Sequence, residues 1–350
     1  MNNKKLILVS TPRHIYLAIG LAYSDPGCGY HLIFIDQKIT QNKNPLYCSM
    51  NKALGPFSSI EYLPIKAAGS KISHRKKVAA FLEVKIQALR PTEILTGNDR
   101  RFEFQYALNY ARMQDYGVVQ GGYIDDGTGS YIAVKDINRI KNMADRFIDT
   151  PLKKLVYGRW YQRSSPLGKS RWVDTRYLCH PQFTDETGVK PLNASDYLTK
   201  EVVDYLTLLM TDSGGDNIQF KSGRSLLVVL PHTSVMEDIY GSYERLVELV
   251  RLNAKGYESV YIKYHPREDN DPLQFGLDFE LLNPKVPLEM YLSLITFSKV
   301  LGDVSSGLMA CKWLYPESEV ATFDIKSAYS ESVDKFFVQL GINKLEVNNE

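Results

Sequence analysis

Residues 118–130 read VVQGGYIDDGTGS, an apolar run that ends in two aspartates and a glycine-containing turn. The run has the length and composition of a buried strand, and the turn that follows it is polar. The same order recurs along the chain, because short apolar runs alternate with stretches of helical periodicity. This alternation is typical of a parallel sheet whose strands are joined by crossover helices.

The alternation occurs in two sets of elements. The first set predicts strands over residues 5–9, 30–35, 93–96 and 118–124. It predicts helices over residues 15–22, 78–89 and 102–113. Residues 151–181 then show little periodicity. The second set predicts a leading helix over residues 194–210, strands over 225–230, 259–263, 299–302 and 319–323, and helices over 238–253, 289–297 and 308–314.

A chain of 350 residues is longer than one hydrophobic core usually organises, so two domains are expected. We predict an α/β fold of two Rossmann-like domains that face a central cleft, with a ligand at the carboxyl ends of the strands. The predicted domains are residues 1–190 and 191–350, and the C-terminal tail could pack back on the first domain.

The charge balance is even, with 42 Lys and Arg against 40 Asp and Glu, and this excludes binding of nucleic acid through a global field. The four cysteines are scattered without a CxxC pair, which favours a reducing cytoplasm over a disulfide framework or a zinc site. No apolar run is long enough for a signal peptide or a membrane span. Tyrosine is frequent, at 23 residues, and suits sugar binding as well as ordinary cores.

Basic residues concentrate in one stretch, residues 153–176, which also holds Trp160 and Trp172 and contains Asp174 as its only acid. The stretch is either a solvated loop or a site for an anionic acceptor or the acidic surface of the inner membrane. We therefore expect a cytoplasmic protein that is at most peripheral on the inner membrane.

Polar segments follow four of the predicted strands: residues 10–14 (STPRH), 125–130 (DDGTGS), 265–268 (HPRE) and 305–307 (SSG). Ser305 and Ser306 at the start of a helix could bind a phosphate or merely cap the helix. His265, held extended by the following proline, could donate to a phosphate or lie in a surface turn. His232 also follows a predicted strand and could line the cleft.

The acidic pair Asp125-Asp126 has three interpretations. Two adjacent carboxylates at a strand end could provide a general base for a hydroxyl group. Asp-Gly is also a common turn dipeptide, and adjacent oxygen ligands could form a weak metal site.

Three segments in this order, YIDDGTGSY (123–131), YIKYHPRE (261–268) and LGDVSSGL (301–308), resemble the signature motifs of bacterial sialyltransferases. Those motifs are an acidic pair followed by Gly, a His-Pro, and a Ser-Ser or Ser-Thr pair. The chain is most similar to the capsular polysialyltransferases, and the lipooligosaccharide sialyltransferases share the same motifs. The resemblance implies a GT-B fold and inverting, metal-independent transfer from CMP-sialic acid without a cofactor.

The resemblance also assigns roles to individual residues. Asp125 would be the general base, and His265 would hold the CMP phosphate and protonate it as it leaves. The remaining donor-site residues would be Pro266, Ser305, Ser306, Gly307 and, on the nucleotide ribose, Glu289. The candidates for the acceptor side or for sugar binding are Thr11, Pro12, Arg13, Asn98, Asp126 and Gly127.

The expected acceptor is a lipid-linked precursor of a bacterial surface glycan, such as O-antigen, lipooligosaccharide or capsule. Capsular polymerases usually carry an extension before the first strand, whereas here that strand begins near Lys5, which favours addition of one sialic acid over polymerisation. One alternative is a CMP-Kdo-dependent transferase. Another is a non-catalytic nucleotide- or glycan-binding protein of the same fold, which would need neither a base nor an acid.

Overall fold

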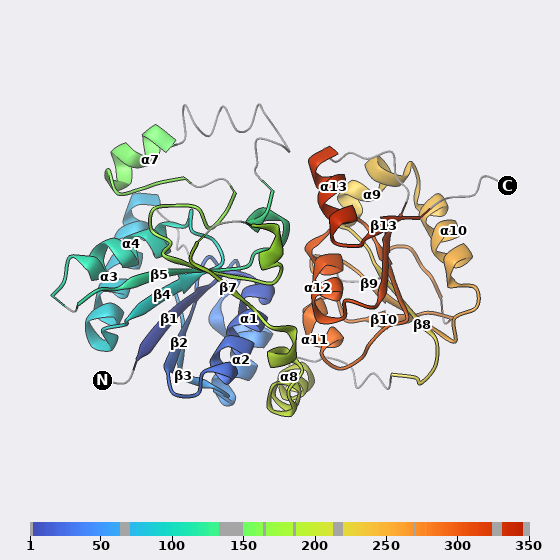
Figure 1. The fold of residues 1–350 in the computed structure, drawn as a ribbon, viewed down its shortest axis with the longest axis horizontal. Coiled ribbons are helices and arrows are strands. Elements are labelled where there is room, and N and C mark those ends of the chain that lie inside the picture. The colour runs from blue at the N-terminus through green and yellow to red at the C-terminus, as the bar shows by residue number, and fades with distance from the viewer. Residues whose placement is uncertain are drawn as a thin grey trace. The chain divides into compact units, whose positions relative to one another are not determined.

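The computed structural model describes residues 3–63, 71–115, 117–132, 150–163, 166–184, 187–212, 220–268, 271–276, 278–323 and 331–345. The chain divides into two compact units, Met1–Tyr205 and Leu206–Glu350. Each unit is built on a parallel sheet flanked by helices (Figure 1). The predicted α/β class with two parallel sheets is therefore confirmed.

The first unit holds a seven-stranded sheet in the order β3-β2-β1-β4-β5-β6-β7. Its strands are β1 (Lys4–Val9), β2 (Gly29–Phe34), β3 (Phe57–Tyr62), β4 (Glu93–Thr96), β5 (Gln120–Ile124), β6 (Thr175–Leu178) and β7 (Val189–Pro191). The helices are α1 (Pro12–Ser24), α2 (Pro45–Lys52), α3 (Lys71–Leu89), α4 (Phe102–Arg112) and α7 (Thr150–Tyr157).

Both faces of this sheet are apolar, because parallel strands are covered on each side. Leu6 and Leu8 of β1 pack in one core cluster with residues of α3 and α4. Figure 1 shows α1 on the opposite face from α3 and α4. Each fully buried Leu contributes about 1.5–3 kcal/mol relative to an exposed one.

The second unit holds a six-stranded sheet in the order β10-β9-β8-β11-β12-β13. Its strands are β8 (Ser225–Val229), β9 (Ser259–Lys263), β10 (Glu280–Leu282), β11 (Lys299–Gly302), β12 (Glu319–Thr322) and β13 (Asn343–Lys344). The helices are α9 (Thr233–Tyr240), α10 (Tyr243–Ala254), α11 (Leu288–Leu292), α12 (Ser306–Leu314) and α13 (Glu331–Gln339). Leu226 and Val228 of β8 share a core cluster with Leu246 and Val250 of α10.

The division between the units falls inside α8 (Lys200–Asp212), after Tyr205, and so later than the predicted boundary at 190/191. The aromatic residues before the division explain this difference. The Tyr197 hydroxyl donates to the Leu17 carbonyl at 2.9 Å, and the Tyr205 hydroxyl donates to the Ala53 carbonyl at 2.8 Å. These contacts tie the start of α8 to the first unit.

Several predicted elements are divided or shorter in the structure. The helix predicted over 194–210 is a 3-10 turn (Ala194–Tyr197) followed by α8. The helix predicted over 238–253 is interrupted, because Gly241 has a φ of 83° and the Ser242 side chain caps α10. The helix predicted from 289 ends at Leu292. At the C-terminus, β13 pairs with β12, and residues 346–350 lie outside the described residues.

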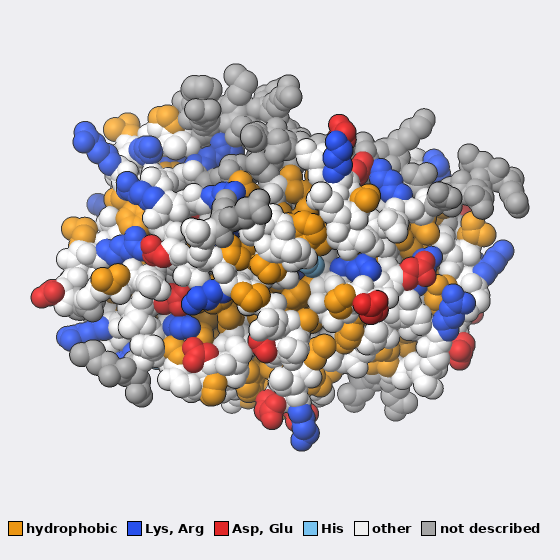
Figure 2. All heavy atoms as spheres, in the orientation of Figure 1, with side chains coloured by type: hydrophobic (Ala, Val, Ile, Leu, Met, Phe, Trp, Pro, Cys, Tyr) orange, Lys and Arg blue, Asp and Glu red, His pale blue; other side chains and the backbone are white. Residues whose placement is uncertain are grey.

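Charged side chains of both signs are interspersed on the face that Figure 2 shows. This distribution agrees with the even charge balance of the sequence. Among the helices of the described ranges, none is long and apolar enough to span a lipid bilayer.

Candidate active site

Asp125 follows directly on β5 and is fully buried, with 0% of its surface exposed. Both carboxylate oxygens accept hydrogen bonds. The donors to Oδ1 are the Gly127 amide (2.6 Å), Arg13 Nη2 (3.4 Å) and Ser130 Oγ (3.4 Å). The donors to Oδ2 are the Cys179 amide (3.0 Å) and the Tyr131 hydroxyl.

The charge state of Asp125 follows from these contacts. Burial alone would raise its pKa, but the Arg13 guanidinium and the hydrogen bonds from Tyr131, Cys179 and Gly127 outweigh it and hold the pKa below the usual value. Asp125 is therefore a fixed anion that anchors the turn after β5. Its oxygens have no surface on which an acceptor hydroxyl could rest.

Asp126, the neighbouring carboxylate, is accessible. Its side chain is 25% exposed, and its Oδ1 lies 2.7 Å from Nε2 of His14, whose side chain is 1% exposed. The Ser10 amide points to Nδ1 of His14 at 3.5 Å, so the ring proton lies on Nε2 and is donated to Asp126. Within the described residues, Oδ2 of Asp126 has no hydrogen-bond partner.

His14 was not among the residues predicted for the site, although it ends the segment STPRH that the sequence singles out. The local fold positions it. Thr11 Oγ1 accepts from the His14 amide at 3.3 Å and caps α1, and Pro12 takes the first position of the helix. A Cβ at Gly97 would lie 2.0 Å from His14 Nε2, so only a glycine after β4 leaves room for the imidazole.

The structure thus separates the predicted acceptor-side residues into groups. Arg13 and Gly127 contact Asp125, and Asp126 contacts His14. Thr11 caps α1, and Pro12 is the first residue of that helix. Asn98 follows Gly97, and its Oδ1 accepts from the Arg100 amide at 3.1 Å, which shapes the turn after β4.

In the second unit, His265 follows β9 and is half-buried. Its Nδ1 accepts from the Arg267 amide at 3.2 Å, which leaves Nε2 as the donor. Burial lowers the pKa of His265, and the neighbouring His232 and Arg267 lower it further. The imidazole is therefore ready to gain a proton when an anion arrives.

His232 follows β8 and lies beside His265, with the two ring centroids 5.5 Å apart. Glu268 links the loops that carry these histidines. Its Oε1 accepts from the Thr233 amide at 2.8 Å and from Thr233 Oγ1 at 2.9 Å, and it lies 3.5 Å from His232 Nε2. Sequence reasoning noted His232 but did not assign it to the donor site.

Ser305 is the N-cap residue of α12, but its side chain makes no capping hydrogen bond. Its Oγ is buried and, in the part of the chain that the structure describes, has no hydrogen-bond partner. The capping interpretation of this hydroxyl is therefore not realised. Ser306 begins α12, and a Cβ at Gly307 would lie 2.9 Å from Leu288 Cδ2, so the glycine permits close packing. A helix N-terminus with an uncommitted hydroxyl is suited to an anion.

The strand order relates His265 to Ser305. β8 lies between β9 and β11, so the loop with His232 lies between the two segments. Because neighbouring strands are about 4.8 Å apart, the segments follow strands separated by roughly 10 Å. This edge of the sheet carries the imidazoles of His232 and His265 and the hydroxyls of Ser305 and Ser306.

Glu289, predicted to bind a ribose, is 7% exposed on α11. Lys263, at the end of β9, is 3% exposed and donates to the carbonyls of Tyr264 at 3.2 Å and Pro284 at 2.9 Å. Burial lowers the pKa of Lys263 to about 7, with Glu289 opposing this shift and Lys285 adding to it. Lys263 was missed because it lies inside a predicted strand. Pro266 contributes its carbonyl, which accepts from Lys285 Nζ at 3.0 Å.

The basic stretch is partly structural. Arg176 is 5% exposed in β6 and donates to the Ser130 carbonyl at 3.0 Å, and Trp172 belongs to the core cluster of the first unit. Residues 164–165 lie outside the described residues. In the described part of the chain, no three His, Cys, Asp or Glu side chains gather so as to hold a metal ion.

Comparison with solved structures identifies the fold. The UDP-GlcNAc 2-epimerase from Methanocaldococcus jannaschii is similar at 13% identity and a TM-score of 0.55, over 98% of this chain and 88% of that one. The UDP-GlcNAc 2-epimerase from Neisseria meningitidis, bound to UDP-GlcNAc, is similar at 13% identity and a TM-score of 0.53, over 98% of this chain and 87% of that one. The glycotransferase of kitacinnamycin is similar at 12% identity and a TM-score of 0.51, over 99% of this chain and 87% of that one. The fold is therefore that of the GT-B glycosyltransferases.

A search of curated protein sequences finds no significant match. The family model of the alpha-2,8-polysialyltransferases (POLYST) matches residues 34–322 and so covers all three segments of the resemblance. The chain belongs to this family, and it is a glycosyltransferase of the sialyltransferase type.

Proposed function

We propose that this protein transfers sialic acid from CMP-sialic acid to a hydroxyl group of a bacterial surface-glycan precursor, with inversion and without a metal ion. The observation that carries the proposal is the Ser305 hydroxyl at the start of α12, which is buried and has no hydrogen-bond partner among the described residues. It lies on the sheet edge that also carries His265 and His232. Family membership supplies the class of sugar.

The leaving phosphate defines the role of the second unit. As the bond between sialyl C2 and the phosphate oxygen breaks, negative charge builds on the phosphate. Ser305, Ser306 and the free amides of α12 donate to that charge, and His265 gives a proton to the departing oxygen. Glu289 is the candidate for the ribose, and Pro266 and Gly307 shape the two loops.

The first unit supplies the base. We assign this role to Asp126, because its side chain is partly exposed, and we assign His14 as the residue that positions it. The acceptor hydroxyl gives its proton to Asp126 as its oxygen bonds to C2. Asp125, for which the resemblance implies the base role, then acts as the buried anion that holds the turn.

Two matched substitutions test this assignment. Asp126→Asn should reduce kcat at least a hundredfold with little change in CMP affinity or thermal stability, because it removes only the proton acceptor. Asp125→Asn should lower the melting temperature, because it removes a buried charge that Arg13 needs. A folded Asp125→Asn protein without turnover, beside an active Asp126→Asn protein, would return the base role to Asp125.

We further propose that the acceptor is a lipid-linked glycan, and that the protein acts in the cytoplasm with peripheral contact between residues 153–176 and the inner membrane. Anomeric analysis of the product tests inversion. Transfer rates with anionic against neutral vesicles carrying the same lipid-linked acceptor test the membrane contact.

A further inference from the structure

The loop after β9, which carries His265, is attached to the loops that follow both neighbouring strands. β9 lies between β8 and β10 in the sheet of the second unit. On the β8 side, Oε1 of Glu268 accepts hydrogen bonds from the Thr233 amide at 2.8 Å and from Thr233 Oγ1 at 2.9 Å. On the β10 side, Lys285 Nζ donates to the Pro266 carbonyl at 3.0 Å. Charged side chains therefore fix the loop from two directions.

Within this loop, the backbone couples Glu268 to the imidazole of His265. The Glu268 amide donates to the His265 carbonyl at 2.9 Å, which closes a β-turn with Pro266 at its second position. The Arg267 amide, inside the same turn, donates to Nδ1 of His265 at 3.2 Å. Because an amide of the turn orients the ring, a displacement of Glu268 would also displace the imidazole. The attachment of Glu268 to Thr233 thus holds the ring as well as the backbone.

Glu268 carries a negative charge at the start of α9. Its side chain is 12% exposed. Burial would raise its pKa, but the hydrogen bonds from Thr233 and the nearby His232 and His265 outweigh burial and hold the pKa below the usual value. The positive end of the α9 dipole also favours an anion at this position. The carboxylate is therefore ionised throughout the pH range in which imidazoles titrate.

The charge of Glu268 opposes the other influences on His265. Among the described residues, the further titratable or charged groups around the imidazole are cations or become cations on protonation: His232 after β8, Lys263 at the end of β9, Arg267 in the same turn, and Lys285 on the far side of Pro266. Burial lowers the pKa of His265, and His232, Arg267 and Lys263 lower it further. Glu268 raises it, since an anion favours the protonated ring.

We propose that Glu268 is a positioning residue for the acid of the reaction: it anchors the turn that orients His265, and its charge stabilises the imidazole in the protonated form that the departing phosphate needs. The inference rests on the proposed function, in which His265 gives its proton to the phosphate oxygen. Glu268 exchanges no proton, and solvent returns a proton to His265 after CMP leaves. Capping of α9 alone would need an acceptor oxygen but no charge.

Nuclear magnetic resonance titration of the imidazoles tests the proposal without any turnover. The full chain has six histidines, and the His265 signal is the one that His265→Ala lacks. Glu268→Gln keeps an oxygen that can accept from Thr233 and removes the charge. In this variant the midpoint of the His265 titration should move to lower pH by at least about 0.3 unit, because the protonated ring loses a neighbouring anion.

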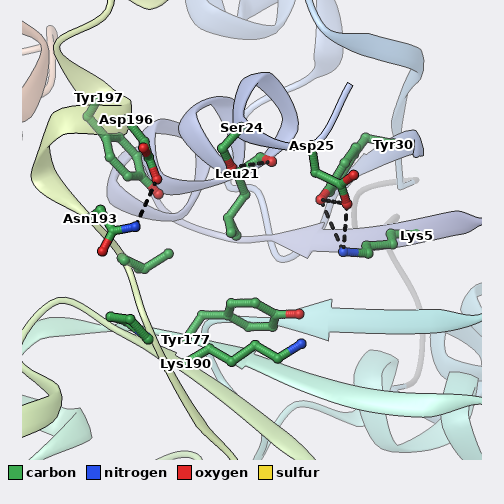
Figure 3. Close-up of a pocket in the computed structure, with 12 residues that line it drawn as sticks. Lys5, Leu21, Ser24, Asp25, Tyr30, Tyr177, Lys190, Asn193, Asp196 and Tyr197 are labelled. Carbon is green, nitrogen blue, oxygen red and sulfur yellow. Dashed lines mark hydrogen bonds and ion pairs between the residues drawn. The ribbon is translucent and has the colours of Figure 1, made fainter. Parts of the chain in front are cut away.

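The matched control is Asp25→Asn in the first unit. Figure 3 shows Asp25 beside Lys5 and Tyr30. Like Glu268, Asp25 accepts from a hydroxyl group, that of Tyr30 at 3.2 Å, and lies near a cation, Lys5 Nζ at 3.2 Å. The control variant removes the same charge between α1 and β2 and should leave the His265 midpoint unchanged.

Kinetics separate the charge of Glu268 from its anchoring contacts. In transfer assays, the limb of kcat/KM that falls as pH rises should move to lower pH in Glu268→Gln. Glu268→Ala also removes the contacts with Thr233, so its kcat below that limb should be at least about tenfold lower than that of Glu268→Gln.

Three results would overturn the proposal: equal His265 midpoints in the wild type and Glu268→Gln, an equal shift in Asp25→Asn, or wild-type kcat in Glu268→Ala. The titration uses neither donor nor acceptor. An absence of transfer by the wild type would therefore count against the proposed function alone.

Discussion

Replacement of Lys263 by methionine tests the electrostatics of the donor unit. Lys263 is 3% exposed, and its ammonium donates to two neutral carbonyls, those of Tyr264 and Pro284. Burial lowers its pKa to about 7 in the folded protein, whereas a lysine in an unfolded chain titrates near about 10.4. Between these values the unfolded state binds one more proton, so the free energy of unfolding of the wild type rises with pH.

The magnitude follows from the two pKa values. Below pH 7 the Lys263 ammonium is charged in both the folded and the unfolded state, so the folded wild type bears the full free-energy cost of burying that charge. From pH 6 to pH 9 the wild type should gain about 2.5 kcal/mol of unfolding free energy relative to Lys263→Met, at about 1.4 kcal/mol per pH unit in the steep part of the range. The hydrogen bonds that Lys263→Met removes change the difference in unfolding free energy between the two proteins by an amount that does not depend on pH.

The assay is urea-induced unfolding of the full chain, with hydrogen exchange of peptides from β8 and β9 reporting the second unit. Lys255→Met, at an exposed lysine after α10, controls for the loss of a surface charge. Parallel pH profiles for the wild type and Lys263→Met would refute the reasoning, because they would show that Lys263 does not lose its proton in the folded state.

Three further predictions concern the catalytic groups. His265→Ala should remove the limb of the pH profile in which kcat/KM falls as pH rises, since the protonated imidazole acts below its lowered pKa; an unchanged limb would exclude it as the acid. Ser305→Ala should weaken CMP binding about tenfold in calorimetry without lowering the melting temperature, because its hydroxyl has no hydrogen-bond partner among the described residues. Gly97→Ala should reduce kcat as much as His14→Ala, because the added methyl displaces the imidazole; normal turnover would contradict that geometry.

Much of the fold could be predicted from the sequence because its strands are short apolar runs. The strands over 93–96, 259–263 and 299–302 have the predicted limits. β6 and β7 were missed because Thr175–Leu178 contains a buried arginine and Val189–Pro191 is short and exposed, so neither has an apolar pattern. The boundary after Tyr205 depends on tyrosine contacts between distant residues, which periodicity does not reveal.

Prediction of the candidate site from the sequence has the same limit, because contacts between distant residues decide it. The sequence indicated which segments carry polar groups, because these follow strands. It could not tell which aspartate of the pair is buried, since that depends on Arg13 and Cys179 arriving from distant elements. His14 and Lys263 were missed for a related reason, because their importance lies in burial and in partners such as Asp126 and Pro284.

The most direct test of the central claim is CMP release from CMP-sialic acid in the presence of EDTA, with a panel of galactose- and sialic-acid-terminated acceptors. CMP-Kdo is run in parallel, and His265→Ala serves as a control with reduced turnover. The account predicts release that depends on the acceptor, a sialylated product, and no turnover of CMP-Kdo. Turnover of CMP-Kdo with none of CMP-sialic acid, or CMP binding without turnover of either donor, would contradict it.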